Sequence, residues 1–386
     1  MSKLEELVQQ LCPDGVEYRT IGEIAVDIFR GSGIKREQIT ETGTPCVRYG
    51  EIYTTYGVWF DTCVSHTDES AITSKKYFEH GDILFAITGE SVEDIAKCSA
   101  YIGKERCLAG GDIVVLRHNQ DPKYLSYALS TTEAQKQKSK GKVKSKVVHS
   151  SVPSIKELVV PIPPLEVQRE IVRILDQFTE LTAELTAELT ARKKQYEYYR
   201  DELLTFGNDI ETSLLRDCCV LSRGEYITKK DAAPGNIPVI LGGQEPAYYI
   251  DRYNHTGQAI VISRSGASAG FVSYWDEEIF VTDGFIVEGT TRVNTKFLYY
   301  FLKNKQEMLN RMKKGGGVPH ITGKNIGEMK IPIIPTQTQE HIVSILDRFD
   351  ALCNDLTSGL PAEIEARRKQ YEYYRDKLLT FKEAKA

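Results

Sequence analysis

The sequence lacks several features that would assign it quickly to a compartment or a kind of site. No apolar run approaches the roughly 20 residues that a membrane-spanning helix needs, and the N-terminal segment MSKLEELVQQLCPDG has no apolar signal-peptide core. The eight cysteines include no CxxC pair, which argues against a structural zinc site and a disulfide framework. These absences predict a cytoplasmic protein with reduced thiols and no membrane association.

Motifs of nucleotide and cofactor chemistry are missing as well. The chain has no GxxxxGK[ST] phosphate loop and no glycine-rich cofactor loop with an NPPY-like tetrapeptide, and PIPP at 161–164 lacks the polar residue that would bind an amino group. The seven histidines show no metal-ligand spacing. We therefore expect no catalytic residues, no metal and no cofactor in this chain.

Composition indicates a multidomain globular protein. The chain has 386 residues, of which 41% are hydrophobic and 27% charged, and this length is most simply divided into two or more domains. The formal net charge of -5 excludes a uniformly basic surface, although local basic segments can still contact phosphates.

An internal repeat organises the sequence. PIPPLEVQREIVRILDQF at 161–178 matches PIIPTQTQEHIVSILDRF at 332–349 in ten of eighteen positions. QYEYYRDELLTF at 195–206 matches QYEYYRDKLLTF at 370–381 in eleven of twelve positions. The repeat unit is about half of the chain, which is typical of a protein built from two equivalent halves.

The repeated segments have the periodicity of long amphipathic helices. Some 40 helical residues would extend roughly 60 Å, which is more than one compact domain requires. Two helices with such apolar faces bury them most readily by packing as an antiparallel pair related by a pseudo-two-fold axis. The alternative is that they are two unrelated core helices. The apolar stripes consist of Ile171, Ile174, Phe178, Leu181, Leu185 and Leu189 in the first copy, and of Ile342, Ile345, Phe349, Leu352 and Leu356 in the second.

The regions outside the repeat resemble each other little and contain short alternating strands broken by glycines. We therefore predict a mixed α/β fold, with two α/β domains separated by two long helices that form an antiparallel coiled coil with an internal pseudo-two-fold repeat. The predicted boundaries are 1–150 and 207–322 for the α/β domains, and 151–206 and 323–386 for the helical segments.

Local signals refine the two helices. The prolines that end PIPP suit the start of the first helix, where a missing N–H costs nothing. Thr336 and Gln339 predict a capping box at the start of the second helix, and Gly359 and Pro361 predict a kink within it.

The first helix also contains the tandem repeat TELTAELTAELTA at 179–191. Four residues make about 1.1 helical turns, so one TAEL unit more or less would keep each leucine on nearly the same face and change the helix length by about 6 Å. The tandem is therefore suited to adjusting a distance. Low-complexity drift in a solvated helix is the alternative.

Taken together, these motifs resemble the specificity subunit of type I restriction-modification systems over essentially the whole chain. The resemblance rests on PIPPLEVQREIVRILDQF, the TAEL tandem, LPAEIEARRKQYEYYRDKLLTF at 360–381 and CPDGVEYRTIGEI at 12–24. It implies a non-catalytic subunit whose two α/β domains are target-recognition domains. Each would read one half of a bipartite, asymmetric site in double-stranded DNA, and the helices would set the spacer between the halves.

The resemblance also implies protein partners. The helices would dock methyltransferase subunits, two in number, which use S-adenosylmethionine, and ATP-dependent restriction subunits, which require ATP and Mg, would join them. The repeated tyrosines are candidate docking or rod-packing positions, and packing is the expected role of at least half of them. They are Tyr196, Tyr198 and Tyr199 in the first copy and Tyr371, Tyr373 and Tyr374 in the second.

Basic loops are candidates for phosphate contacts. The run EAQKQKSKGKVKSK at 133–146 and NRMKKGGGVPH at 310–320 follow similar predicted helices in the two halves, and a solvated charged loop is the alternative for each. The candidate phosphate contacts are Lys138, Lys140, Lys142 and Lys144 in the first domain and Lys313 and Lys314 in the second.

Base reading needs side chains such as arginine, which pairs with guanine, and glutamine, which pairs with adenine. Arg48 with Tyr49, Gln244, and Arg264 with Ser265 lie beside glycines that permit close backbone approach, although an ordinary loop role is the alternative for each. Together with the lysines, they form the predicted DNA-binding set.

Two rival functions have different consequences. A methyltransferase or nuclease would need the motifs that are missing. A coiled-coil scaffold that joins two protein-binding domains would fit the same architecture, but it would not show salt-dependent binding to duplex DNA.

Overall fold

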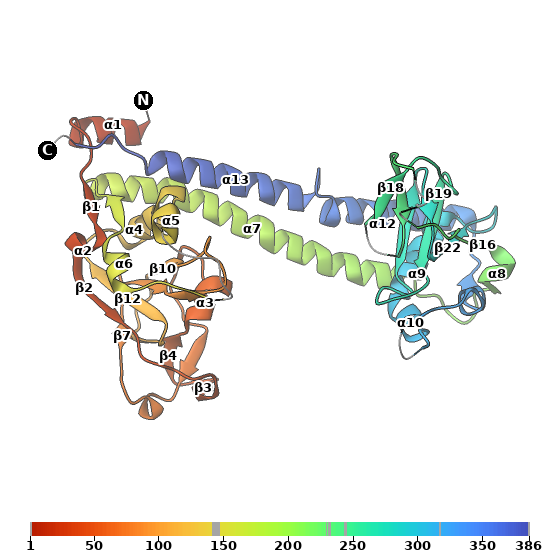
Figure 1. Cartoon of the computed structure of the whole chain (residues 1–386), viewed down its shortest axis with the longest axis horizontal. Coiled ribbons are helices and arrows are strands. Elements are labelled where there is room, and N and C mark those ends of the chain that lie inside the picture. The colour runs from red at the N-terminus through yellow and green to blue at the C-terminus, as the bar shows by residue number, and fades with distance from the viewer. Residues whose placement is uncertain are drawn as a thin grey trace. The chain divides into compact units, whose positions relative to one another are not determined.

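The computed structural model describes residues 2–140, 147–228, 230, 233–242, 245–315 and 318–384. The chain divides into two compact units, Met1–Glu184 with Ile364–Ala386 (unit 1) and Leu185–Glu363 (unit 2) (Figure 1). Each unit contains one α/β head and parts of the long helices, so the unit boundary falls inside those helices. None of the helices in the described part of the chain is apolar enough over a sufficient length to cross a bilayer.

Two five-stranded sheets form the head of unit 1, in the orders β2-β12-β8-β10-β5 and β3-β6-β4-β11-β7. Buried side chains from both sheets, among them Val47, Phe78, Leu84 and Val115, form one shared apolar cluster. The strands are β1 Tyr18–Thr20, β2 Ala25–Arg30, β3 Ile39–Thr40, β4 Thr44–Val47, β5 Trp59–Phe60, β6 Ser65–Thr67, β7 Tyr77–Phe78, β8 Ile83–Ala86, β9 Thr88–Gly89, β10 Cys98–Tyr101, β11 Cys107–Ala109, β12 Ile113–His118, β13 Val148–His149 and β14 Val159–Pro161.

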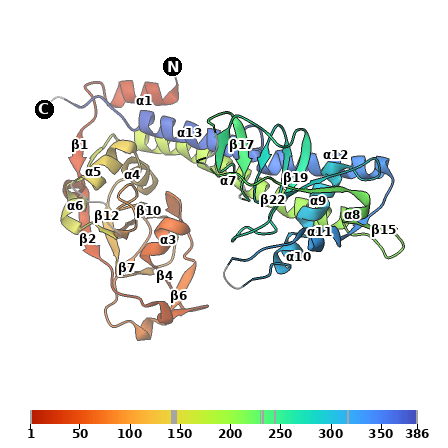
Figure 2. The same ribbon diagram turned by 45° about the vertical axis from the view of Figure 1, so that its right-hand side comes forward.

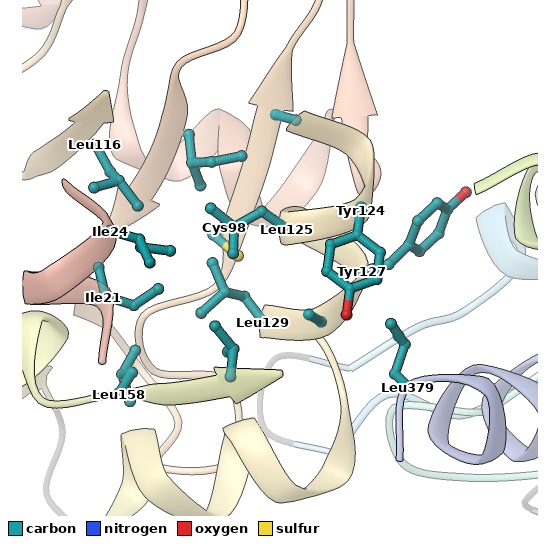
Figure 3. Close-up of a cluster of buried hydrophobic side chains, with 14 of the residues drawn as sticks. Ile21, Ile24, Cys98, Leu116, Tyr124, Leu125, Tyr127, Leu129, Leu158 and Leu379 are labelled. Atoms are coloured by element: carbon teal, nitrogen blue, oxygen red, sulfur yellow. The ribbon is translucent and has the colours of Figure 1, made fainter. Parts of the chain in front are cut away.

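Helix α4 joins the head of unit 1 to the long helices. Figure 3 shows Leu125 and Leu129 of α4 turned toward Cys98 and the α2 residues, while Tyr124 and Tyr127 lie on the side nearer Leu379. One continuous core therefore includes the sheet, α4 and the long helices of this unit. The helices of the head are α1 Lys3–Leu11, α2 Ile21–Ile24, α3 Tyr49–Thr54, α4 Pro122–Leu129, α5 Thr132–Ser139 and α6 Val152–Lys156, with short 3-10 turns at Arg36–Gln38 and Glu69–Ala71.

Unit 2 repeats this plan with fewer strands. Its sheets have the orders β16-β22-β19-β20 and β18-β17-β21. Helix α9 packs on β19 and β20, and α11 packs on α8 (Figure 2). The elements are β15 Thr212–Leu214, α8 Leu215–Cys218, β16 Val220–Arg223, β17 Ile237–Ile240, β18 Tyr248–Ile250, β19 Gln258–Ser263, β20 Val272–Asp276, β21 Phe280–Val281, β22 Gly284–Glu288, α9 Thr295–Asn304, α10 Gln306–Arg311, α11 Gly323–Gly327 and β23 Lys330–Pro332.

The long helices are α7 (Leu165–Leu203), α12 (Thr336–Asn354) and α13 (Leu360–Leu378). The 39 residues of α7 confirm the predicted length of the first helix. In unit 1 the first part of α7 packs against the last part of α13, and in unit 2 the last part of α7 packs against α12. This order confirms the predicted antiparallel pairing and the mixed α/β fold.

The second long helix is interrupted rather than only kinked. Helix α12 ends at Asn354, and Asp355 then accepts hydrogen bonds from the backbone N–H groups of Thr357 and Ser358. Pro361 lies in the first turn of α13, where its missing N–H leaves no helical hydrogen bond unmade. The turn at Asp355 therefore interrupts the helix where Gly359 and Pro361 predict only a kink.

The two helix-start predictions have different outcomes. The carbonyl of Pro164 accepts from the N–H groups at the start of α7, so PIPP does end where the helix begins. The predicted capping box of α12 is wrong, because Pro335 is the cap residue and Thr336 makes no capping hydrogen bond. Gln339 is instead buried and bonded to other groups.

Residues 151–161, which the sequence pattern groups with the first helical segment, form α6 and β14. Strand β14 pairs with β1 in antiparallel register, with Tyr18 opposite Pro161. In unit 2, β23 pairs with β15 in the same way, with Thr212 opposite Pro332. The division of the chain into the four predicted domains stays a prediction.

Candidate nucleic-acid interface

Both heads have the same local backbone at one end of the central sheet. Immediately after β8, the N–H of Ile87 donates to the carbonyl of Asp112, and the carbonyl of Ile87 accepts from Ser150. After β19, Arg264 makes the same two backbone bonds with Asp283 and Ile321. The residue that follows each of these positions lies opposite a histidine, which is His149 in unit 1 and His320 in unit 2. Loops with different side chains are thus presented from one repeated frame.

In unit 2 this frame brings the predicted residues together. Arg264 Nη1 lies 3.1 Å from Asp283 Oδ1, and the Ser265 hydroxyl donates to the same carboxylate. Lys314 pairs through its backbone with His320, and Lys313 Nζ lies 3.1 Å from the carbonyl oxygen of Ala267. The Asp283 carboxylate orients Arg264, and the positive charges of Lys313 and Lys314 lie nearby. This combination suits a site that binds phosphate and base edges.

Glycine geometry supports close approach beside this cluster. Gly242, which follows β17, has a φ of 115°, and a Cβ there would lie 2.3 Å from Ser263 Oγ. Only glycine therefore fits where the segment after β17 approaches Ser263 at the end of β19. Gln244 lies outside the described residues.

In unit 1, Arg48 and Tyr49 line an open depression of about 440 Å³, together with Gly110 and Gly111. Arg48 Nε and Nη2 both lie 3.0 Å from Glu51 Oε1, and Glu51 is buried. The tyrosine is 40% exposed. The arginine is therefore held in one orientation at the edge of a hollow, as a residue that reads a base edge would need to be.

The predicted lysines of unit 1 have different surroundings. Lys138 is buried, with Nζ 3.9 Å from Cys98 Sγ, and burial lowers its pKa. Its ammonium group is therefore turned away from any phosphate at the surface in this structure. Lys140 is exposed at the end of α5, whereas Lys142 and Lys144 lie outside the described residues.

Four of the six predicted tyrosines pack against neighbouring rings, whereas Tyr198 and Tyr373 are 63% and 61% exposed. Tyr374 stacks on Phe178, with ring centroids 5.4 Å apart, and Tyr199 stacks on Phe349 at 5.8 Å. Tyr196 also contacts Phe349, and burial raises its pKa to about 12. Tyr371 lies beside Tyr127, with ring centroids 6.4 Å apart. Both copies therefore use Tyr196 and Tyr199, or Tyr371 and Tyr374, to hold the helix against its neighbours.

Two carboxylates outside the set of predicted site residues attach the heads to the helices. Asp176 on α7 accepts from Tyr127 and pairs with Lys123 at 2.7 Å, both of them on α4. Asp347 on α12 accepts from Tyr300 at 2.6 Å and pairs with Lys296 at 2.9 Å, both of them on α9. We call these two networks the aspartate clamps.

Two buried glutamines, each about two helical turns before the aspartate of the same helix, reinforce the clamps. Gln168 Oε1 accepts from the backbone N–H of Asp121, and its amide group donates to Gln120 and Pro163. Gln339 accepts from Asn294 N–H at 2.7 Å and donates to the carbonyls of Arg292 and Ile334. Polar identities within the apolar stripes of the repeat are the sequence signal that would have found these residues.

The described residues contain no group of three or more His, Cys, Asp or Glu side chains that could hold a metal ion. All eight cysteines are buried and form no disulfide bond. Two heads with different loops, each attached to the long helices by the same clamp, have the architecture of a bipartite binding protein.

The family model for the type I restriction modification DNA specificity domain matches the chain twice, at residues 13–192 and 207–366. The chain therefore belongs to the type I restriction modification DNA specificity family. This membership confirms the prediction of a recognition subunit that is distinct from the catalytic subunits.

Individual relatives carry the same description. The chain is 37% identical over 266 residues to a putative type I restriction enzyme specificity subunit of Haemophilus influenzae, an alignment that covers 62% of this chain and 68% of that protein. It is 34% identical over 261 residues to the EcoR124I/EcoR124II specificity subunit of Escherichia coli, covering 59% and 64% of the two chains.

Solved structures share the fold. The S subunit of a type I restriction-modification system from M. genitalium superposes with a TM-score of 0.62 and 18% identity, covering 95% of this chain and 96% of that one. A chain from a structure on complex assembly and conformational transition of the type I R-M system gives 0.64 and 16% identity, covering 96% and 98%. At these identities, the likeness concerns the fold alone.

Proposed function

We propose that this chain recognises double-stranded DNA for a type I restriction-modification complex, with each head reading one half of a bipartite, asymmetric site. One observation carries the proposal: the aspartate clamps and buried glutamines repeat between the units, whereas the loops after β8 and β19 differ. A common frame with two different surfaces is what an asymmetric two-part target requires. Arg264, Ser265 and Lys313 in unit 2, and Arg48 at the start of α3 in unit 1, supply chemistry for phosphates and base edges.

The helical segments, in this proposal, set the spacer between the half-sites and dock two methyltransferase subunits, which restriction subunits then join. S-adenosylmethionine, ATP and Mg would serve those partner subunits. The chain itself would supply recognition and position.

Methylation mapping tests this function most directly. The chain is co-expressed with the methyltransferase subunit encoded beside it, in a host without adenine methylation, and modified adenines are mapped genome-wide. The expected result is one bipartite, asymmetric motif. A folded, purified complex that leaves the genome unmethylated would contradict the proposal.

Salt dependence separates this function from a protein scaffold. A DNA reader that neutralises several phosphates loses affinity steeply as salt rises, with a slope in log units of about 0.9 per phosphate contact. Binding of a bipartite duplex is measured between low and physiological salt. A scaffold would show neither a steep slope nor a preference for the mapped motif.

The TAEL tandem gives a more specific prediction. Deleting one unit shortens α7 by four residues, about 6 Å, which corresponds to no more than about two base pairs of duplex. The recognised spacer should therefore shorten by one or two base pairs while both half-sites stay unchanged. Methylation mapping of the deletion variant provides the measurement, and an unchanged spacer would refute the role of the tandem.

A further inference from the structure

The edge strands of the two central sheets end in the same way. Arg30 is the last residue of β2, and Arg223 is the last residue of β16. The glycine after each arginine donates its backbone N–H to the first residue of the neighbouring strand, which is β12 for Gly31 and β22 for Gly224. The two Arg-Gly pairs therefore occupy equivalent positions, although the sequences of the heads resemble each other little.

An aspartate lies beside this point in each head. Asp112 directly precedes β12, and its backbone carbonyl accepts from the N–H of Ile87. Asp283 directly precedes β22, and its backbone carbonyl accepts from the N–H of Arg264. The two aspartates are thus equivalent as well, but their carboxylates hold arginines from different strands.

In unit 1 the aspartate holds the arginine of the edge strand. Arg30 Nη2 donates to the Asp112 carboxylate, and Arg30 Nε donates to the carbonyl oxygen of Gly111 at 2.8 Å. These two bonds fix the plane of the guanidinium and leave its other N–H groups for a further partner. The side chain is 59% exposed, and Asp112 lines the same depression as Arg48. Arg30 is therefore an oriented and accessible arginine at the edge of that depression.

In unit 2 the equivalent carboxylate holds a different arginine. Asp283 is bonded to Arg264, which directly follows β19, while Arg223 is exposed. The position of Arg264 in unit 1 is taken by Ile87, which is uncharged and only 5% exposed. Each head thus presents one carboxylate-held arginine at this end of its sheet, from the edge strand in unit 1 and from an inner strand in unit 2.

The carboxylate gives such an arginine a preference for base edges. Because the guanidinium is held before DNA binds, contact costs less side-chain entropy. The negative charge of the aspartate also repels a phosphate at short range, whereas the O6 and N7 atoms of guanine are uncharged acceptors that one arginine contacts with two hydrogen bonds. An exposed arginine that is not held in this way, such as Arg223, suits a phosphate contact instead.

We propose that Asp112 and Asp283 are equivalent positioning residues, and that Arg30 reads a guanine in the first half-site as Arg264 reads a base in the second. The inference rests on the proposed function, and it adds a reading residue that lies outside the predicted DNA-binding set. It also gives the two aspartates a part in specificity without contact to DNA. Asp112 acts through Arg30, and Asp283 acts through Arg264.

Methylation by the full chain in complex with the methyltransferase subunit tests the role of Arg30. Rates are measured on duplexes in which each base of the first half-site is replaced in turn. Arg30→Ala should reduce discrimination by roughly ten- to a hundredfold at one guanine and leave discrimination in the second half-site unchanged. The salt dependence of DNA binding should stay the same, whereas loss of a phosphate contact would lower its slope by about 0.9. Unchanged discrimination throughout the first half-site, or a lower slope, would overturn this role.

Coupling between variants tests the aspartates. Asp112→Ala should reduce discrimination at the same guanine, and its combination with Arg30→Ala should lose no more than Arg30→Ala alone. Asp112→Asn, which keeps an acceptor but not the charge, should have an intermediate effect and replaces Asp112→Ala in the cycle if that variant does not fold. Thermal unfolding identifies the folded variants. Losses that add in the double variant would mean that Asp112 does not act through the arginine.

Arg223→Ala is the matched control, because Arg223 has the position of Arg30 but the neighbouring aspartate is bonded to Arg264 instead. It should leave base discrimination in the second half-site unchanged. A change as large as that of Arg30→Ala would mean that strand position decides and not the aspartate. A wild-type complex that methylates no bipartite motif would overturn the proposed function itself, whereas a mapped motif with unchanged discrimination by Arg30→Ala overturns only this inference.

Discussion

Unit 1 and unit 2 share a frame but differ in the surface built on it. The strand order β2-β12-β8-β10 corresponds to β16-β22-β19-β20, and in both units a parallel pair stands in the second sheet, β4 with β11 and β17 with β21. Unit 1 adds β5, β3, β7 and helix α3, and Arg48 at the start of α3 has no helical counterpart among the described residues of unit 2. Helices α4 and α9, which carry the partners of the aspartate clamps, repeat, whereas these additional elements of the unit 1 head do not.

The largest expected effects fall on the two buried glutamines, which repeat between the units. Gln168→Leu and Gln339→Leu should each lower the free energy of unfolding by about 3 kcal/mol, because each leaves a backbone N–H and carbonyl groups without their buried partner. Equal losses would support equivalent frames. Chemical denaturation of both variants gives the measurement, and a loss confined to one unit's variant would break the equivalence.

Recognition should be separable between the units. Arg264→Ala removes a side chain of the unit 2 loop and should weaken recognition of the second half-site by roughly ten- to a hundredfold, or about 1–3 kcal/mol, while the first half-site is unaffected. Arg48→Ala should have the reverse effect. Methylation rates on sites altered in one half are compared for the two variants. Unchanged methylation at every site would count against both assignments.

Aromatic packing should differ modestly between the units. Phe349 contacts both Tyr196 and Tyr199, whereas within the described part of the chain Phe178 has one ring contact, with Tyr374. Phe349→Leu should therefore destabilise its unit by about 1 kcal/mol more than Phe178→Leu destabilises the other. Thermal unfolding of the two variants shows the difference, and equal shifts would mean that the second ring contact adds nothing.

The smallest effect concerns a lysine that only unit 1 buries. Burial lowers the pKa of Lys138 in the folded chain. Between the folded and the unfolded pKa, the unfolded chain therefore binds one proton more than the folded chain, and stability rises with pH. The cost of burying the lysine thus shrinks as pH rises toward the ordinary pKa of a lysine. Lys138→Met should therefore be more stable than the wild type at pH 7, by a margin that falls between pH 7 and about 10. Denaturation at both pH values tests this, and a constant margin would exclude the titration.

The lysine also shows where reading charge from sequence fails. Lys138 and Lys140 stand two positions apart in the same basic run, yet α5 turns the first into the core and leaves the second exposed. Charge alone does not specify which face of a short helix is covered. The capping box fails for a related reason. Gln339 accepts a hydrogen bond from Asn294 at the start of α9, a segment distant in sequence, and is therefore not available to cap its own helix.

The sequence by itself determined the two-fold organisation, the long helices, the place where the second helix is disturbed and the family, because periodicity and repetition can be read from the order of the residues. Only the tertiary structure decided which polar residues of the repeat are interior. Asp176 and Gln168 look like surface positions until α4 packs over them. The same packing divides the repeated tyrosines into inward and outward sets, since that depends on where Phe178 and Phe349 meet them across the helix pair.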